Sequence, residues 1–483
     1  MKIIKTDCLI IGSGPGGAVV ANELIENNFT CILVEEGQQY NMPDSPIDNN
    51  IAKLGEELQS KWRNGGAQFA LGKHPISFSE ACCFGGGSEI NSGIYQEVSD
   101  ELINKWSKKY EIDNFNSDII NKFYSKIKSK INLVTETQNA GFPTELINTI
   151  SLEEGWSIKD LPRISKRRDD TIRDSNDLIR QSMSQTLLKK AQAKGLHVYS
   201  KIKIIKLNKK NGKIVSAIGK GSNNQKYKFI AKNFFMCCGA IQSPYLLKKS
   251  GITKNIGKFF RMHPTLRMIV KFPYELNSDN KPLPLKAITE FLPEIRLSGA
   301  NFSLPILSSL VSEDWINRKH ILKDWKKTII LYVMINPEGY GQIFNFPYIK
   351  EPIVRYKLQK HDFDNLSFGL QKYANALFKS GAEEIIPCIS NSKSIKSIDD
   401  IRTFDSDYLE NNRINLMSIH LFGSCIPGKN KKYCSTDSYG KINSYDNIFI
   451  CDSSQIPEST GVNPQATVMA ISLRNVENFL NKT

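Results

Sequence analysis

Two polar residues near the end of the chain have types and spacing that suit chemistry on a bound molecule. His420 stands in the segment Ser-Ile-His-Leu-Phe-Gly-Ser-Cys, and Asn463 stands further on in Gly-Val-Asn-Pro-Gln. A neutral imidazole can accept a proton, and a primary amide can hold the oxygen that loses it. The periodic apolar segment Gln465–Leu480 follows Asn463 and a proline, which predicts a helix that begins beside the amide. The tail therefore predicts a proton acceptor, a hydrogen-bond donor and a helix N-terminus that lie close together.

The start of the chain predicts the element that would hold a cofactor for this chemistry. Asp7–Ile11 is a continuous apolar run, which is typical of a parallel strand covered on both faces. A glycine-rich turn follows it, and then a helix is expected over Ala18–Asn27 and a second strand over Thr30–Val34. This strand, loop, helix, strand order is typical of a dinucleotide-binding unit.

The glycines of this turn have the spacing that a pyrophosphate requires. Gly12 permits the tight turn, Gly14 lets the pyrophosphate approach the backbone, and Gly17 lets the helix pack on the strand. Glu35 comes at the end of the second strand, where a carboxylate can hydrogen-bond the hydroxyls of a ribose. The glycine pattern alone also occurs in ordinary turns, but the order of the elements favours dinucleotide binding.

Two further glycine segments come later in the chain. Phe84–Tyr95 contains three consecutive glycines, whose amides are exposed to a flat or anionic group. Gly239–Ile252 follows an apolar run and predicts a strand end followed by a helix that starts at a proline. In the first of these segments the residues expected to contact the bound group are Gly85, Gly86, Ser88 and Asn91.

The remaining chain divides into helical and strand-like regions. An irregular polar stretch is expected over Gln38–Ser79, a helical region over Asp100–Leu161 and a helix over Leu178–Lys194. The middle, 266–355, has the short alternating pattern of an antiparallel sheet, and Phe302–Leu310 and Thr328–Ile335 are its most apolar strands. Further strands are expected over His197–Leu207, Ile214–Ile218, Tyr227–Ile230 and Asn233–Cys238, and a helix over Phe363–Ser380.

Composition narrows the class of protein. The chain has 483 residues with 40% hydrophobic content, which suffices for a large core. The net charge of +15 is spread out without interleaved aromatics, so nucleic-acid binding is not expected, while an anionic substrate or peripheral membrane contact stays open. The ten cysteines and six histidines show no ligand spacing, so reduced thiols and no metal are expected. No apolar run is long enough for a transmembrane helix, and the N-terminal residues do not have the pattern of a secretory leader. We therefore expect a cytoplasmic protein.

The four motifs, in this order, resemble the glucose–methanol–choline (GMC) family of FAD-dependent oxidoreductases. The resemblance covers Asp7–Glu35, Phe84–Tyr95, Phe235–Pro264 and Ser418–Leu480, and the middle of the chain carries little of it. It implies that Gly12, Gly14, Gly17 and Glu35 bind the ADP part of FAD. It also implies that Phe84–Tyr95 and Gly239–Ile252 are the family's two signatures and that Ile204 meets the adenine with its backbone.

The resemblance also gives the tail distinct roles. His420 matches the family histidine beside the reactive face of the flavin, and Asn463 matches its partner. Asp452 and Ser453 match positions near the pyrophosphate and ribityl chain. The helix start at Pro464 and Gln465 would stabilise negative charge at the N1–C2 carbonyl edge of the flavin.

Two other positions qualify this assignment. His263 matches a family histidine that is usually structural. Ile90 stands where relatives with covalently attached flavin have histidine, so FAD is expected to bind non-covalently.

These observations predict an α/β protein with a Rossmann-like FAD-binding domain and an inserted substrate region built on an antiparallel sheet plus helices. The FAD-binding domain is expected to comprise 1–95, 178–265 and 410–483, and the substrate region 96–177 and 266–409. The expected reaction is oxidation of an alcohol to a carbonyl, with hydride passing to flavin N5, His420 as base, Asn463 as hydrogen-bond partner, and dioxygen or another carrier as final acceptor.

Two alternatives to this reaction stay open. One is a lyase or photodecarboxylase of the same fold that retains FAD without net alcohol oxidation. The other is a basic flavin-binding protein at a membrane surface without turnover. The sequence leaves open which alcohol is bound, whether a sugar, an amino sugar, a sterol or an aliphatic alcohol, and also the oligomeric state.

Overall fold

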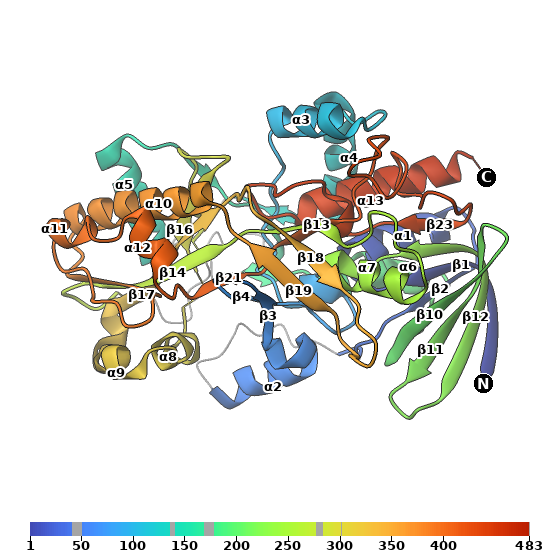
Figure 1. Cartoon of the computed structure of the whole chain (residues 1–483), viewed down its shortest axis with the longest axis horizontal. Coiled ribbons are helices and arrows are strands. Elements are labelled where there is room, and N and C mark those ends of the chain that lie inside the picture. The colour runs from blue at the N-terminus through green and yellow to red at the C-terminus, as the bar shows by residue number, and fades with distance from the viewer. Residues whose placement is uncertain (41–50, 136–140, 169–177, 277–283, 301, 483) are drawn as a thin grey trace.

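The computed structural model describes residues 1–40, 51–135, 141–168, 178–276, 284–300 and 302–482. Within these ranges the chain folds around two large β-sheets that lie side by side along the long axis of the molecule (Figure 1). Both termini lie at the end that holds the smaller sheet, and α10 and α5 lie at the opposite end (Figure 1). The mixed α/β architecture confirms the expected fold class.

The smaller sheet has seven strands in the order β10-β11-β12-β1-β2-β9, with β23 paired to β12. The strands β9, β2, β1, β12 and β23 run parallel, and β10 and β11 form an antiparallel extension. Parallel strands covered on both faces require apolar residues in succession, which the end of β1 provides. The bounds are β1 Lys2–Ile11, β2 Cys31–Val34, β9 His197–Tyr199, β10 Ile202–Lys210, β11 Lys213–Gly221, β12 Lys226–Met236 and β23 Ile448–Ile450.

Helices cover both faces of this sheet. Cys8 and Ile10 of β1 pack with apolar residues of α1 and α13, whereas Leu9 and Ile11 pack with Leu246 on the other face. The alternation follows from the strand geometry, which turns successive side chains to opposite faces. The helices are α1 Pro15–Glu26, α6 Leu187–Ala193, α7 Gly239–Lys249 and α13 Gln465–Leu480.

The larger sheet has thirteen strands and is mostly antiparallel. Its order is β22-β13-β18-β19-β3-β4-β21-β14-β17-β16-β15-β6, with β20 paired to β14, and only the pairs β19–β3 and β21–β4 are parallel among the described strands. The bounds are β3 Gln68–Leu71, β4 Ile76–Phe78, β6 Ile158–Asp160, β13 Lys258–Met262, β14 Thr265–Lys271, β15 Lys286–Ile288, β16 Ile295–Gly299, β17 Thr328–Ile335, β18 Tyr340–Phe344, β19 Ile353–Lys357, β20 Glu384–Pro387, β21 Leu416–Ser418 and β22 Leu421–Ser424.

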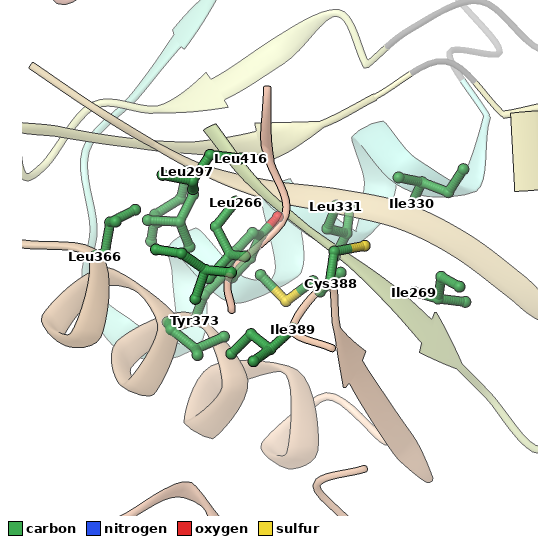
Figure 2. Packing of buried hydrophobic residues seen from close by; sticks show 14 of the residues in the cluster. Leu266, Ile269, Leu297, Ile330, Leu331, Leu366, Tyr373, Cys388, Ile389 and Leu416 are labelled. Carbon is green, nitrogen blue, oxygen red and sulfur yellow. The ribbon is translucent and has the colours of Figure 1, made fainter. Parts of the chain in front are cut away.

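The helix α10, Lys360–Lys379, closes the main apolar core of this sheet. Figure 2 shows Leu366 and Tyr373 of α10 directed toward Leu266 and Leu297 of the strands. All four of these side chains are fully buried. Burial of a leucine side chain contributes about 1.5–3 kcal/mol, so this layer is a main source of the region's stability.

Shorter elements connect and cover the two sheets. A small third sheet comprises β5 Leu133–Val134, β7 Arg163–Arg167 and β8 Leu178–Arg180. The remaining helices are α2 Ile51–Lys61, α3 Asp100–Tyr110, α4 Ser117–Lys128, α5 Phe142–Glu154, α8 Leu304–Ser312, α9 Trp315–Arg318, α11 Ile398–Ile401 and α12 Ser406–Asn411, with short 3₁₀ turns η1 Arg63–Gly66, η2 Gly86–Glu89, η4 Lys319–Lys327 and η5 Ser453–Gln455.

Several sequence expectations about the inserted region and the adjoining segment 178–194 are wrong. Phe302–Leu310 is mainly helical, because Ser303 accepts a hydrogen bond from the Ile306 amide at 3.4 Å and Pro305 fits the first helical turn. The expected helix over Leu178–Lys194 is the strand β8, a turn and α6. The expected helical region Asp100–Leu161 also contains the strands β5 and β6.

Three further expectations need correction outside that region. The irregular stretch Gln38–Ser79 contains α2, β3 and β4, and its residues 41–50 lie outside the described residues. The expected strand His197–Leu207 is two strands, because Lys201 takes a positive φ of 58° between them, and Tyr227–Ile230 and Asn233–Cys238 fall in one strand, β12.

The helix α7 starts at Gly239 rather than at Pro244. Pro244 lies inside the helix, and its missing amide hydrogen leaves the Ala240 carbonyl without its helical donor. The Ser424 hydroxyl donates to that carbonyl at 2.7 Å instead. A contact from β22 therefore offsets the hydrogen bond that the proline removes.

The sheets do not follow the expected domain division strand by strand. The ranges 1–95, 178–265 and 410–483 contain β3, β4, β13, β21 and β22, and all five strands belong to the larger sheet. Segments of the expected cofactor domain therefore form part of the sheet that carries the substrate region. This is why residues from both regions meet at one site.

Candidate active site

A cavity of about 1160 Å³ runs between the two sheets and collects most of the expected site residues. Its glycine-rich end is lined by the first turn and the second glycine segment, and its other end by residues of the larger sheet. The expected residues that line it are Gly12, Gly14, Glu35, Gly86, Asn91, Ile204, Gly239, His420, Asp452, Ser453, Asn463, Pro464 and Gln465.

The glycine turns of the first and second segments lie against each other. Gly12 has a positive φ of 100°, and a Cβ at this position would lie 2.4 Å from the Cys237 carbonyl oxygen. A Cβ on Gly86 would lie 2.6 Å from Cα of Gly14. Because no side chain fits there, both backbones are open to a pyrophosphate-sized group in the cavity.

Gly17 does not line the cavity. A Cβ at Gly17 would lie 2.1 Å from the Gly12 carbonyl oxygen. This close approach is the helix-to-strand packing that the sequence pattern assigns to the third glycine.

Glu35 connects the end of β2 to both glycine turns. One carboxylate oxygen accepts from the Ser13 amide at 3.0 Å and from the Ser13 hydroxyl at 2.7 Å, and the other accepts from the Gly37 amide at 2.8 Å. The Ser13 hydroxyl in turn accepts from the Gly85 amide at 2.9 Å. Burial raises the pKa of the Glu35 carboxyl, and these hydrogen bonds oppose the rise. Ser13 was missed by the sequence reasoning because it stands between glycines as an ordinary turn residue.

Ser88 and Gly85 do not line the cavity, unlike the other expected residues of their segment. The Ser88 hydroxyl donates to the Gly85 carbonyl at 2.7 Å and accepts from the Met183 amide at 2.9 Å. Its side chain therefore holds the turn closed from behind. The sequence could not indicate this direction, because Met183 lies far along the chain.

Arg180 of β8 supports the same segment and was not predicted. Its guanidinium donates to the carbonyl oxygens of Ser88 at 2.6 Å, Asn91 at 2.7 Å and Glu89 at 2.8 Å. Three charge-assisted bonds to carbonyls of this one turn fix the curvature of the segment.

Asp452 and Ser453 follow β23 at the cavity wall. The Asp452 carboxylate accepts from the Gly239 amide at 3.0 Å, the Ser243 hydroxyl at 2.5 Å and the Ser454 amide at 2.9 Å. Burial raises the pKa of Asp452, and the hydrogen bonds oppose this shift. The carboxylate thus joins the start of α7 to the turn that carries Ser453.

Asn91 and Gln465 both line the cavity and contact each other. The Asn91 amide nitrogen donates to Oε1 of Gln465 at 2.5 Å. The Gln465 Nε2 atom is buried and has no hydrogen-bond partner in the structure. An unpaired buried donor beside the N-terminus of α13 fits the carbonyl edge of a flavin ring. Together with the glycine cradle, this donor makes the residues present a fit to FAD.

His420 and Asn463 meet at the wall of this cavity. The Nε2 atom of His420 lies 3.0 Å from Nδ2 of Asn463, and both residues are half-buried. His420 lies between β21 and β22, and Asn463 lies two residues before the start of α13. Burial, together with the positive charge of Arg296, lowers the pKa of His420 to about 3. The imidazole is therefore neutral at physiological pH.

His263 contacts the other ring nitrogen of His420, Nδ1. The Nδ1 atoms of the two imidazoles lie 3.0 Å apart, and the Gly461 amide donates to Nε2 of His263 at 3.1 Å. His263 is fully buried, and burial lowers its pKa well below the ordinary value. His263 thus contacts His420, the backbone just before Asn463 and the Ser418 hydroxyl.

Arg296 of β16 supports Asn463 from behind. Its Nη1 atom donates to Oδ1 of Asn463 at 2.8 Å and to Oε1 of Gln96 at 2.6 Å. Arg296 is 1% exposed. It comes from the inserted region, where no motif marks it.

The part of the cavity next to the larger sheet is largely apolar. Side chains of β17 and α8 contribute to it, as does the residue before His420. The apolar residues are Leu54, Leu58, Phe302, Ile306, Ile330, Met334, Met417 and Ile419. This lining suits a substrate with an apolar body and one polar end.

Among the described residues, no cluster of three or more histidine, cysteine or acidic side chains has the arrangement of a metal site. In the same ranges, no helix is both long and apolar enough to cross a membrane.

Comparison with known proteins places the chain among the GMC oxidoreductases. Family models described as GMC oxidoreductase match residues 58–265 and 348–472. An uncharacterised GMC-type oxidoreductase of Sinorhizobium fredii is 34% identical over 99% of this chain and 95% of its own length. A long-chain-alcohol oxidase of Arabidopsis thaliana is 24% identical over 97% of this chain and 67% of its own length.

Two solved structures share the fold. Pyridoxine 4-oxidase from Mesorbium loti superposes with a TM-score of 0.75 at 14% identity, and covers 99% of both chains. Formate oxidase superposes with a TM-score of 0.74 at 13% identity, over 100% of this chain and 99% of its own. The family models and the full-length relative agree, and the chain belongs to the GMC family of FAD-dependent oxidoreductases.

Proposed function

We propose that this protein oxidises the CH–OH group of an alcohol to a carbonyl, with FAD as hydride acceptor. The observation that carries the proposal is the pair of His420 and Asn463, which lies 3.0 Å apart at the wall of the cavity that holds the glycine cradle. A base and a hydrogen-bond donor at one point are what the hydroxyl oxygen needs as it loses its proton.

The residues of the pair would divide the work on the hydroxyl group. His420 accepts the hydroxyl proton, because its pKa of about 3 keeps the ring neutral before the reaction. Asn463 donates its Nδ2 hydrogen to the same oxygen, and Arg296 holds the amide in that orientation through Oδ1. FAD, when bound, supplies the acceptor for the hydride that leaves the carbon.

An aliphatic alcohol is the substrate class that we place first. The apolar lining contributed by α8 and β17 supports it, as do the relatives named long-chain-alcohol oxidase in Arabidopsis thaliana. A sugar and a sterol are compared with an aliphatic alcohol in the experiment described below.

Three finer points belong to the same proposal. FAD binds non-covalently, because Ile90 offers no nucleophile at the position where some relatives carry histidine. The ranges 1–95, 178–265 and 410–483 hold the cofactor, and 96–177 and 266–409 shape the substrate side. The protein works in the cytoplasm, supported by ten cysteines that are all free. Trichloroacetic acid precipitation tests the first point, since flavin that stays with the pellet would contradict it.

Anaerobic titration of the purified flavoprotein tests the reaction. Octan-1-ol, cholesterol and glucose are added separately, and the flavin absorbance near its long-wavelength maximum is followed. We expect octan-1-ol to bleach the flavin, and His420→Ala to slow the bleaching by about 10²–10⁴-fold.

A flavin that stays oxidised with every alcohol would contradict the proposal and favour a lyase or photodecarboxylase. Unchanged bleaching in His420→Ala would contradict the role of the base. Reduction by glucose or cholesterol but not by octan-1-ol would contradict the substrate class alone.

A further inference from the structure

Arg296 brings a buried positive charge to the site without a carboxylate to balance it. Its Nη1 atom donates to the side chains of Asn463 and Gln96, which are both neutral. Its Nε and Nη2 atoms are buried and have no hydrogen-bond partner in the structure. Within the described part of the chain, no acidic side chain forms an ion pair with it. A buried charge of this kind is costly unless an anion approaches it.

The positive charge of Arg296 acts on the two histidines of the site. The positive charge of Arg296 adds to burial in lowering the pKa of His420 and, with the neighbouring imidazole, that of His263. The same field that disfavours a second positive charge favours a negative one at the same place. The space beside His420 is thus electrostatically suited to an anionic oxygen.

The number of hydrogen-bond donors and acceptors at the site also favours an anionic oxygen. A continuous row of contacts runs from the Gly461 amide through His263, His420 and Asn463 to Arg296. The groups at both ends can only donate, because a backbone N–H and a guanidinium have no acceptor atom. Each neutral imidazole and the Asn463 amide offers one donor and one acceptor along the row.

Such a row has one hydrogen more than its contacts can hold. If the Gly461 end sets the order, His420 carries its proton on Nε2, and that N–H faces the N–H of Asn463. If the Arg296 end sets the order, Nε2 of His420 accepts from Asn463, and the conflict moves to His263 and the Gly461 amide. One contact between two donors is therefore present in either arrangement.

An oxygen without a hydrogen removes this conflict when it lies in the cavity within hydrogen-bond reach of both Nε2 of His420 and Nδ2 of Asn463, in place of their direct contact at 3.0 Å. It accepts from Nε2–H of His420 and from Nδ2–H of Asn463, so that every contact of the row joins one donor to one acceptor. A hydroxyl that donates into the row restores the surplus. The uncharged alcohol is thus the poorer partner for the resting site.

We propose that the part of the cavity lined by both His420 and Asn463 is a binding site for a carboxylate, with Arg296 and His263 as its positioning residues. The inference rests on the proposed function only in using the same two residues, and it requires no turnover. A carboxylic acid with the carbon chain of the substrate is then a tight dead-end ligand. For the alcohol itself, the same preference favours the alkoxide-like oxygen over the hydroxyl.

Calorimetry of the flavin-loaded protein with octanoate and octan-1-ol, under anaerobic conditions, tests this. We expect octanoate to bind at least about tenfold more tightly than octan-1-ol. Arg296→Met should lose at least about tenfold in octanoate affinity and change octan-1-ol affinity little. Arg296→Lys, which keeps the charge, should retain most of the octanoate affinity.

Matched variants distinguish an effect of the hydrogen-bond order at His263 from a general loss of structure or charge. His263→Gln can accept from the Gly461 amide and donate to His420, so it should bind octanoate like the unmodified protein, whereas His263→Leu should bind it more weakly. Arg355→Met removes a guanidinium at an exposed position of β19 that does not line the cavity. We expect it to leave the preference for octanoate over octan-1-ol intact.

The outcomes are distinct. Equal affinities for octanoate and octan-1-ol overturn the inference, and so does an unchanged octanoate affinity in folded Arg296→Met. Loss of the same preference in Arg355→Met also overturns it, because the effect would then follow total charge. Failure of octan-1-ol, cholesterol and glucose alike to reduce the flavin, with tight octanoate binding kept, would overturn the proposed function and leave the carboxylate site standing.

Discussion

The Nη1 atom of Arg296 donates to Oδ1 of Asn463 at 2.8 Å, and this contact turns the amide nitrogen of Asn463 toward His420. An asparagine alone could present either its oxygen or its nitrogen to the cavity. Because a guanidinium only donates, the oxygen is held on the Arg296 side. The orientation of the Asn463 amide is thus set by Arg296 of β16.

Replacing Asn463 by aspartate should raise the pKa of His420. A carboxylate near Nε2 favours the imidazolium, which typically raises the pKa by about 1–3 units from its value of about 3. We therefore expect the rate of flavin reduction in Asn463→Asp to fall on the acid side, with a limb between about pH 4 and 6. Stopped-flow reduction by octan-1-ol across this range measures the limb. Asn463→Ala serves as the control, and an acid limb of the same position in both variants would contradict the explanation.

The two buried imidazoles should make the fold sensitive to acid. In the unfolded chain a histidine titrates near pH 6.5, whereas burial and neighbouring positive charge lower the pKa of His420 and of His263 in the folded state. As pH falls below about 6.5, the unfolded state binds protons that the folded state does not, so stability decreases with decreasing pH. Above that pH the two histidines contribute no pH dependence.

Thermal melts at about pH 7 and 5 measure this dependence. The double variant His263→Gln with His420→Gln should lose less melting temperature between the two values than the unmodified protein. His361→Gln, at an exposed position of α10, is the matched control and should behave like the unmodified protein. Equal losses in all three proteins would contradict the prediction.

The parts of the fold that follow from local sequence were predicted well. The apolar run Asp7–Ile11 is the buried half of β1, and the expected helix Ala18–Asn27 overlaps α1. In this segment residues adjacent in the sequence determine the structure, because the strand, turn and helix are consecutive. The same holds for Gln465–Leu480, whose bounds agree with α13.

The parts that depend on distant segments were not predictable in the same way. Arg296 reaches Asn463 from a strand far earlier in the chain, and Arg180 reaches its carbonyls from β8. No local pattern marks either arginine, since each appears as an ordinary charged residue in a short strand. The direction of the Ser88 side chain depends on the Met183 amide in the same way. Long-range contacts thus determine which polar residues line the cavity and which support it.

Substitution of Gly86 by alanine should weaken cofactor retention. A Cβ there would lie 2.6 Å from Cα of Gly14, at a residue with a positive φ of 57°. Because the backbone of the first glycine turn cannot move aside cheaply, the two turns would separate, and flavin affinity should fall at least about tenfold. Ultrafiltration with absorbance of the released flavin measures the affinity. Gly55→Ala, in α2 with open space around its Cα, is the control, and equal flavin loss in both variants would contradict the argument.

Removal of the Arg180 guanidinium should act on the cofactor and spare the chemistry. Its three bonds to the carbonyls of Ser88, Glu89 and Asn91 hold the second glycine segment in place. Charge-assisted hydrogen bonds contribute about 1.5–3 kcal/mol each, so Arg180→Met should increase flavin dissociation by at least about tenfold. In protein kept saturated with FAD, the rate of flavin reduction should change less than about threefold, because Arg180 makes no contact with His420. Arg355 lies at an exposed position in β19, away from the cavity. Arg355→Met therefore controls for the loss of a positive charge as such and should retain flavin fully. A reduction rate that falls in parallel with flavin affinity would instead place Arg180 in the catalytic arrangement.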